Sequence, residues 1–209
     1  MNIIENKNEI LAVILAGGLS SRMGGGIKSF KKFNDKTIFD RILENINKQV
    51  DQIIINNNKN SQLFLKYNTT IVEDIFGNFA GPLAGIHSAL SWIKKNNNNV
   101  KWLITVPGDT PFIPKNLVQI LLNSAVEGDY EIVLAKSSGK THPIIGIWRT
   151  YLHESLDKDL NAGIRKIMIW AQKHRLGYAK FEGYNYDPFF NINYNEDINK
   201  AEEIEKNYF

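Results

Sequence analysis

Short apolar runs alternate along the chain with segments in which apolar residues recur every three or four positions. The run Ile10–Leu15 is rich in branched residues and leads straight into glycines, which is typical of a buried strand that ends in a loop. Comparable runs predict further strands at Gln52–Asn56, Thr70–Glu73, Trp102–Val106, Glu131–Ala135 and Ile144–Trp148.

The intervening segments have the spacing of amphipathic helices. Ile38, Ile42 and Ile46 recur every four positions and therefore share one helix face. Thr37 is suited to cap this helix, because Asp40 stands in the capping-box position. Helices are expected over Ile38–Lys48, Gly81–Lys95, Pro114–Asn123, Arg149–Lys158 and Gly163–Lys173, with a last helix after the N-cap Asn195.

Strands that alternate with helices predict an α/β protein with one mostly parallel sheet and helices on both faces. The chain of 209 residues has the length of one domain, and no repeat or linker divides it. In such a sheet, ligands lie beyond the carboxyl ends of the strands. This rule selects the segments Ala16–Lys28, Asn56–Asn58, Glu73–Asp74 and Pro107–Thr110 as candidates for chemistry.

Composition narrows the class of protein. Hydrophobic residues make up 43% and charged residues 22%, as in ordinary globular proteins. The formal net charge of +3 is too small for a dedicated nucleic-acid binder. The absence of cysteine excludes disulfides and cysteine-ligated metal sites, and four scattered histidines do not form a metal motif. No apolar run approaches a membrane span of about 20 residues. We therefore expect a cytoplasmic protein with no membrane or nucleic-acid partner.

The glycine-rich segment Leu15–Lys28 is the strongest candidate for a binding site. Its five glycines allow several backbone N–H groups to face one anion. Arg22 adds a planar fork for phosphate oxygens, and Lys28 adds a point charge. Ile27 stands where a P-loop has glycine before its lysine, and the dinucleotide fingerprint finds no match. The alternative is a flexible loop with two solvated cations.

Polar residues follow the other strands. Asp109 ends the fourth strand, where one carboxylate beside a triphosphate suits Mg²⁺. Asn56 and Asp74 offer oxygens that can accept N–H groups of a ligand, although both also fit ordinary polar loops. Gly81 and Gly85 lie at the start of a predicted helix, where free N–H groups can face an anion. The alternative is that both glycines serve only the packing of the helix against the sheet. The four tryptophans, Trp92, Trp102, Trp148 and Trp170, fit core positions.

The order of these motifs resembles the MobA family, the molybdenum cofactor guanylyltransferases. The segment Leu15–Lys28 is similar to that family's glycine-rich signature, with Leu-Ala-Gly-Gly followed by Arg-Met-Gly and Lys. The resemblance continues at Gly81–Ile86, Pro107–Pro114, His142-Pro143 and Asn191–Asn193. Two departures stand out. Ile27 replaces the family's usual aspartate, and Tyr194-Asn195 replaces its usual Thr-Pro.

The resemblance implies a Rossmann-like three-layer nucleotidyltransferase fold. It implies one domain over residues 1–209, with a nucleotide-binding half at about 10–115 and an acceptor-binding half at about 116–209. The implied reaction transfers GMP from GTP to the phosphate of the molybdenum–molybdopterin cofactor and releases pyrophosphate. Two alternatives remain: a cytidylyl- or sugar-phosphate nucleotidyltransferase of the same fold, and a non-catalytic nucleotide-binding regulatory domain.

The resemblance also assigns roles to residues. It gives Arg22, Lys28 and Asp109 catalytic roles, with Asp109 as the Mg²⁺ ligand. It implies transient contact with molybdoenzymes or cofactor-delivery proteins. The nucleotide-binding set is Leu15, Ala16, Gly17, Gly18, Lys28, Asn56, Asp74 and Asp109, and the acceptor-binding set is Gly81, Gly85, His142, Asn191 and Asn193.

Overall fold

Parallel pairing of the apolar runs builds the main sheet of the computed structural model, which describes residues 7–17, 28–77 and 81–209. Its strand order is β5-β4-β1-β6-β8-β7-β9. The strands are β1 (Ile10–Leu15), β4 (Gln52–Asn56), β5 (Thr70–Val72), β6 (Trp102–Pro107), β7 (Ile132–Ser137), β8 (Lys140–Arg149) and β9 (Leu176–Lys180). A separate two-stranded ribbon pairs β2 (Lys32–Phe33) with β3 (Lys36–Thr37).

Six strands of the main sheet run in one direction. β1 is parallel to both β4 and β6, β5 is parallel to β4, and β9 is parallel to β7. Only β8 runs against its neighbours β6 and β7 within the described part of the sheet. The predicted mostly parallel sheet is thus confirmed.

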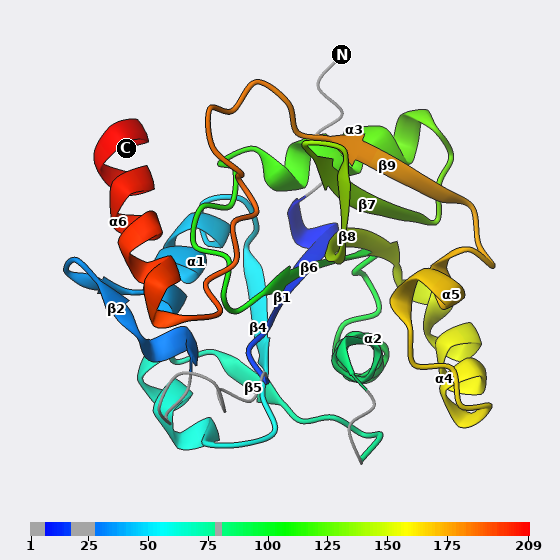
Figure 1. The fold of residues 1–209 in the computed structure, drawn as a ribbon. Coiled ribbons are helices and arrows are strands. Elements are labelled where there is room, and N and C mark those ends of the chain that lie inside the picture. Colours follow the sequence, from blue (N-terminus) through cyan, green and yellow to red (C-terminus); the bar gives the residue numbers. More distant parts are fainter. Residues whose placement is uncertain (1–6, 18–27, 78–80) are drawn as a thin grey trace.

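Helices cover both faces of the sheet (Figure 1). Side chains of a strand alternate between faces, so Ala12 and Ile14 of β1 join one core while Leu11 and Val13 join the other. The first core packs against α1 (Ile38–Ile46), α3 (Leu117–Glu127) and α6 (Asn195–Tyr208), and the second against α2 (Pro82–Asn96), α4 (His153–Asn161) and α5 (Ile167–Ala171). The predicted three-layer α/β fold is confirmed.

Local sequence signals account for several helix boundaries. Thr37 caps α1, because its Oγ1 accepts from the Asp40 N–H at 3.0 Å and its own N–H donates to Asp40 Oδ2 at 3.2 Å. At α6, the predicted cap at Asn195 is wrong by one residue. Tyr194 is the N-cap, because Asp197 Oδ2 accepts the N–H groups of Asn193 and Tyr194 and so starts the helix at Asn195.

Other elements differ from the prediction. β8 begins at Lys140 rather than Ile144, because a two-residue turn with left-handed backbone at Ser138 and Gly139 joins it directly to β7. The ribbon β2–β3 and the edge strand β9 were not predicted, since short strands leave little periodicity. Several helix ends also differ. The helix predicted over Pro114–Asn123 is observed over Leu117–Glu127. The helix predicted over Gly163–Lys173 is shorter and covers Ile167–Ala171. The helix predicted over Arg149–Lys158 is observed over His153–Asn161, after a short turn of 3-10 helix.

The core contains most of the predicted tryptophans. Trp102, Trp148 and Trp170 are fully buried, and Trp92 is half-buried against the second core. The Trp148 indole N–H donates to Thr105 Oγ1 at 2.9 Å. Within the described ranges, no helix is long and apolar enough to cross a membrane.

Register brings the candidate loops to one edge of the sheet. Leu15, the last residue of β1, pairs with Asn56 at the end of β4 and with Pro107 at the end of β6. Asn56 in turn pairs with Val72 at the end of β5. The segments that follow these strands therefore leave the sheet together, as the rule for parallel sheets predicts.

Candidate active site

Lys28 joins residues from both halves of the chain. Its Nζ donates to Asp109 Oδ2 at 2.6 Å, to Asn193 Oδ1 at 2.6 Å and to Asn191 Oδ1 at 3.1 Å. The side chains of Lys28 and Asp109 are 14% and 23% exposed, so the cluster opens to the surface. We call these four residues the lysine cluster. Three of the residues predicted from sequence therefore lie within hydrogen-bond reach of a fourth, Lys28.

The backbone holds this cluster in place. The N–H of Gly108 donates to Leu15 O at 2.9 Å, which fixes Asp109 beside the end of β1. A Cβ on Gly108 would lie 3.1 Å from Ala16 Cα, a contact that a larger residue could make only if the backbone shifted by a few tenths of an ångström. Ile192 is fully buried, and its N–H donates to Asp109 O at 3.0 Å. Its neighbours Asn191 and Asn193 both reach Lys28.

A second cluster surrounds Asp74. Asn56 Nδ2 donates to Asp74 Oδ1 at 2.8 Å, and Asn58 Nδ2 donates to Asp74 Oδ2 at 2.6 Å. Asn58 Oδ1 also accepts the Asp74 N–H at 2.6 Å. We call these three residues the aspartate cluster. Asn58 was not singled out from sequence, although its position two residues after Asn56 at a strand end was the available signal.

Glycines make room around the aspartate cluster. A Cβ on Gly17 would lie 3.9 Å from Asn58 Nδ2, whereas a Cβ on Gly85 would lie only 2.5 Å from Asn56 Oδ1. Gly85 thus lets α2 approach Asn56, a residue of the predicted nucleotide-binding set. The predicted acceptor-binding role of Gly85 stays a prediction. Gly81 has a φ of 70° and is the N-cap residue of α2.

Asn57 secures the first residues of the glycine segment. It is 2% exposed, and its Nδ2 donates to Ala16 O at 3.0 Å. The Ala16 N–H donates to Asn56 O at 2.9 Å, so both backbone groups of Ala16 are fixed. Asn57 lies in the predicted segment Asn56–Asn58, but no separate role was predicted for it, because buried and exposed asparagines look alike in a run of three. Gly18, Arg22 and Ile27 lie outside the described residues, and their roles stay predictions.

His142 lies in a different polar network. Its Nε2 is 2.7 Å from Ser137 Oγ, and Ser137 Oγ donates to Asp187 Oδ1 at 3.1 Å. Burial lowers the pKa of His142. This arrangement is not a nucleophilic triad, because the carboxylate accepts from the serine rather than from the histidine, and Ser137 is 2% exposed.

Asp109 is the candidate metal ligand of the site. Among the residues that the structure describes, no group of three or more His, Cys, Asp or Glu side chains is placed to hold a metal ion. Asp109 supplies one partly exposed carboxylate, with the amide oxygens of Asn191 and Asn193 nearby. The single carboxylate of Asp109 fits Mg²⁺, which keeps waters and takes phosphate oxygens for its remaining positions.

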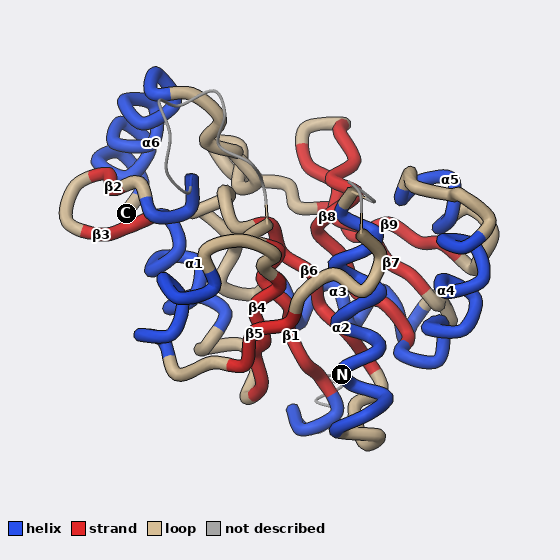
Figure 2. Tube along the Cα trace, turned by 90° about the horizontal axis from the view of Figure 1, so that it is seen from below, coloured by secondary structure: helices blue, strands red, loops and turns tan. Residues whose placement is uncertain are grey.

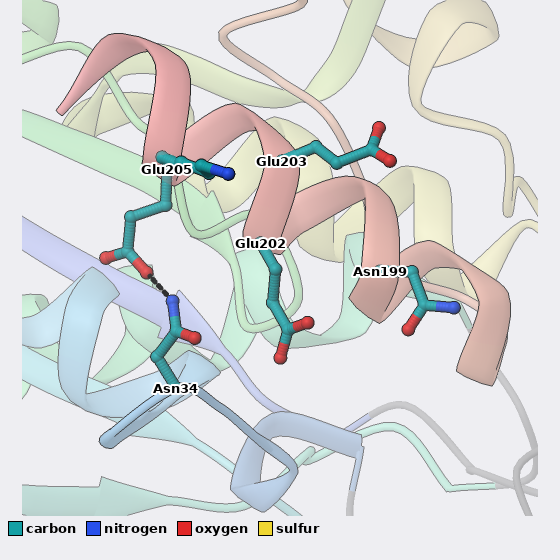
Figure 3. A pocket seen from close by; sticks show the side chains of 6 residues that line it. Asn34, Asn199, Glu202, Glu203 and Glu205 are labelled. Atoms are coloured by element: carbon teal, nitrogen blue, oxygen red, sulfur yellow. Dashed lines mark hydrogen bonds between the residues drawn. The ribbon is translucent and has the colours of Figure 1, made fainter.

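A surface hollow beside α6 is separate from both clusters (Figure 3). Figures 1 and 2 place α6 next to the β2–β3 ribbon, and Asn34 in the ribbon's turn donates to Glu205. The carboxylates that line the hollow would repel a negatively charged triphosphate. The hollow is lined by Asn34, Asn199, Glu202, Glu203, Glu205 and Lys206.

Comparison with known proteins agrees with this fold. The model of the MobA-like NTP transferase domain matches residues 12–176. A molybdenum cofactor guanylyltransferase from Nitrobacter hamburgensis is 39% identical over 193 residues, which cover 92% of each chain. A protein of the same name from a Shewanella species is 35% identical over 185 residues, covering 88% of this chain and 91% of that protein.

Solved structures share the architecture at lower identity. Molybdopterin-guanine dinucleotide biosynthesis protein A from Archaeoglobus fulgidus superposes with a TM-score of 0.72 at 22% identity, covering 94% of this chain and 98% of that chain. A 4-diphosphocytidyl-2C-methyl-D-erythritol synthase from Anaerococcus prevotii gives 0.71 at 16% identity, covering 96% and 97%. Both likenesses concern the fold alone.

The fold and the sequence matches together define a nucleotidyltransferase. The chain belongs to the family of MobA-like NTP transferases that includes the molybdenum cofactor guanylyltransferases.

Proposed function

We propose that this protein transfers GMP from GTP to the phosphate of the molybdenum–molybdopterin cofactor and releases pyrophosphate. The observation that carries the proposal is the lysine cluster, in which Lys28 contacts Asp109 from the nucleotide side and Asn191 and Asn193 from the acceptor side. Relatives that carry the name of this activity are 32–39% identical over most of the chain.

The proposed reaction joins two anions. A phosphate oxygen of the acceptor attacks the α-phosphorus of GTP, a new P–O bond forms, and the bond to the β-phosphate oxygen breaks. Such reactions depend on positioning and charge neutralisation more than on a covalent protein group. The Lys28 ammonium, which lies between the two sides, is suited to neutralise charge on both reactants. A general base is unnecessary because a phosphate nucleophile is already ionised at neutral pH.

Magnesium belongs to the proposal. Asp109 would hold the ion, and a bound Mg²⁺ would neutralise charge on the triphosphate. The ion pair between Asp109 and Lys28 keeps this carboxylate beside the glycine segment, where the phosphates are proposed to bind.

Base recognition is assigned to the aspartate cluster. Guanine presents an N–H and an amino group side by side, and a carboxylate can accept from both. Asn56 donates to one oxygen of Asp74 and Asn58 to the other, and the two bonds set the orientation of this acceptor. Cytosine presents one amino group beside an acceptor nitrogen, which a carboxylate repels. This difference favours GTP over CTP.

We also propose a cytoplasmic location and transient contact with molybdoenzymes or cofactor-delivery proteins. In this proposal the cofactor is handed on after guanylylation, and neither nucleic acid nor membrane takes part. The two-part division, with a nucleotide half at about 10–115 and an acceptor half at about 116–209, places Lys28 and Asp109 in the first half and both asparagines of the lysine cluster in the second.

Pyrophosphate release tests the proposal. The protein is incubated with Mg²⁺, molybdenum cofactor and either GTP, ATP or CTP, with matched reactions that lack the cofactor. Release with GTP that depends on the cofactor is the expected result. Release with CTP instead would assign the protein to the cytidylyl branch, and absence of release with every nucleotide would favour a different acceptor or a regulatory domain.

A further inference from the structure

We infer that Ser137 is a positioning residue that holds the segment of Asn191 and Asn193 against Lys28 through Asp187. The inference rests on the proposed function of the lysine cluster. Ser137 ends β7, and Asp187 lies in the connection between β9 and α6 that carries both asparagines. The Lys28 ammonium donates to Asp109, Asn191 and Asn193, so Ser137 and Asp187 would act on it through the segment that carries the asparagines.

The hydrogen bonds around Ser137 have a defined direction. A serine hydroxyl has one proton, and at Ser137 it is donated to Asp187 Oδ1 at 3.1 Å. In the hydrogen bond of 2.7 Å between His142 Nε2 and Ser137 Oγ, the histidine must then be the donor. His142 therefore carries its proton on Nε2, and the chain of donors runs from His142 through Ser137 to Asp187. Because Ser137 is 2% exposed, water does not readily replace either bond.

His142 reaches this place through an irregularity in the sheet. Leu134 of β7 pairs with Gly146, whereas the next residue, Ala135, pairs with His142. Three residues of β8 are thus left out of the ladder, and the first of them is Pro143, which has no N–H to pair. The His-Pro motif therefore serves to present His142 to Ser137.

The segment beyond Asp187 is fixed at successive points. Asp187 Oδ1 also accepts the N–H of Phe189 at 3.0 Å. The Phe189 ring is 3% exposed and packs 4.8 Å from the His142 ring and 5.0 Å from the Phe181 ring, measured between centroids. Ile192 follows, buried and bonded to Asp109 O. Asn191 lies between these two anchors, which leaves its amide little freedom to leave Lys28.

Removal of the serine hydroxyl should therefore act on the acceptor side alone. It leaves Asp187 and His142 without their shared partner, and the segment 187–193 loses its first anchor. The aspartate cluster lies on other elements, at the ends of β4 and β5, and keeps its own hydrogen bonds. GTP binding should persist while the amides of Asn191 and Asn193 spend less time at Lys28.

Two disruptive variants and two controls test the inference. Ser137→Ala and Asp187→Ala each break the link, whereas Asp187→Asn keeps an Oδ1 that can accept from Ser137 and Phe189. Ser91→Ala removes a serine–histidine hydrogen bond of similar length, 2.8 Å to His153, between α2 and α4. Hydrogen exchange of amides 187–193, kcat/KM for molybdenum cofactor and the Kd for GTP are measured in all variants.

In both disruptive variants we expect about a tenfold loss in kcat/KM for the cofactor, faster exchange over 187–193, and a GTP Kd within about twofold of wild type. Asp187→Asn should retain most activity, and Ser91→Ala should match wild type. Wild-type exchange and kcat/KM in Ser137→Ala would overturn the inference, as would an equal loss in Ser91→Ala. If wild-type protein transfers GMP to no acceptor, the proposed function fails, while exchange in Ser137→Ala still decides whether the anchor exists.

Discussion

The ammonium group of Lys28 has three N–H bonds, and three side-chain oxygens accept from it, those of Asp109, Asn191 and Asn193. A phosphate that enters this cluster competes with these oxygens for the lysine protons. The residues of the cluster should therefore act as a unit, and single substitutions should have effects that do not add.

Replacement of the carboxylate in this cluster is the first prediction. Asp109→Ala should lower turnover by about 100-fold or more, because it removes both the partner of Lys28 and the proposed Mg²⁺ ligand. The fold should persist, since the side chain is 23% exposed. Turnover at saturating Mg²⁺ and thermal unfolding measure the two effects. Asp35→Ala, at an 80% exposed carboxylate, is the control. Near-wild-type Mg²⁺-dependent turnover in Asp109→Ala would refute the assignment.

The second prediction concerns base selection. Asp74→Asn keeps the size of the side chain but replaces one acceptor oxygen by an NH₂ donor. The hydrogen bond that Asn56 or Asn58 donates to that oxygen is then lost. The ratio of kcat/KM for GTP to that for CTP should fall by about tenfold or more. The neighbouring Glu73 is exposed, so Glu73→Gln should leave the ratio unchanged. An unchanged ratio in Asp74→Asn would remove this cluster from base recognition.

At the level of elements, α2 approaches the ends of the strands through Gly85. A Cβ there would lie 2.5 Å from Asn56 Oδ1 and 2.8 Å from Leu15 Cδ2. Gly85→Ala should therefore displace Asn56 and weaken GTP binding by about tenfold, as measured by titration calorimetry. Gly77→Ala is a matched control, because a Cβ at Gly77 would meet nothing within 4 Å. Equal GTP affinity in both variants would contradict the packing argument.

The interface between α2 and α4 gives a prediction about pH. The rings of His87 and His153 stack there at 4.9 Å, and burial lowers the pKa of both below the ordinary 6.5. The folded protein therefore binds fewer protons than the unfolded chain once the pH falls below about 6.5. The free energy of unfolding should be highest above that pH and should decrease toward acid.

Urea unfolding at pH 7.5 and pH 5.5 measures this dependence. His153→Gln removes one of the stacked titrating groups, so the difference between the two pH values should become smaller in that variant. The predicted decrease is contradicted if the free energy of unfolding of the wild-type protein is equal or higher at pH 5.5 than at pH 7.5.

Elements with strong periodicity were predictable from sequence, and elements defined by long-range pairing were not. The strand Ile10–Leu15 was predicted with its observed bounds, because a buried parallel strand is apolar throughout. The strand at Leu176–Lys180 was missed, because it alternates over only five residues and exists through its pairing with β7. The same limit applies to helix ends such as that of α5.

At the scale of the whole molecule, the lysine cluster joins residues that lie far apart in the sequence. Sequence order placed Asn56, Asp74 and Asp109 at strand ends and Lys28 in the segment that follows the first strand. Parallel register brings these strand ends to one edge of the sheet. The contact of Asn193 with Lys28 spans 165 positions along the chain and has no local signal. The resemblance supplied both asparagines, but only the structure brings them to the lysine.

Labelled GTP shows directly which part of the nucleotide is transferred to the cofactor. Reactions with molybdenum cofactor are run in parallel with GTP labelled at the α-phosphate or at the γ-phosphate, and the label in the purified cofactor product is counted. If GMP is transferred, the α-label appears in the cofactor product and the γ-label in pyrophosphate. Transfer of the γ-label to the cofactor, or no label in the cofactor from either substrate, would contradict the proposed transfer of GMP.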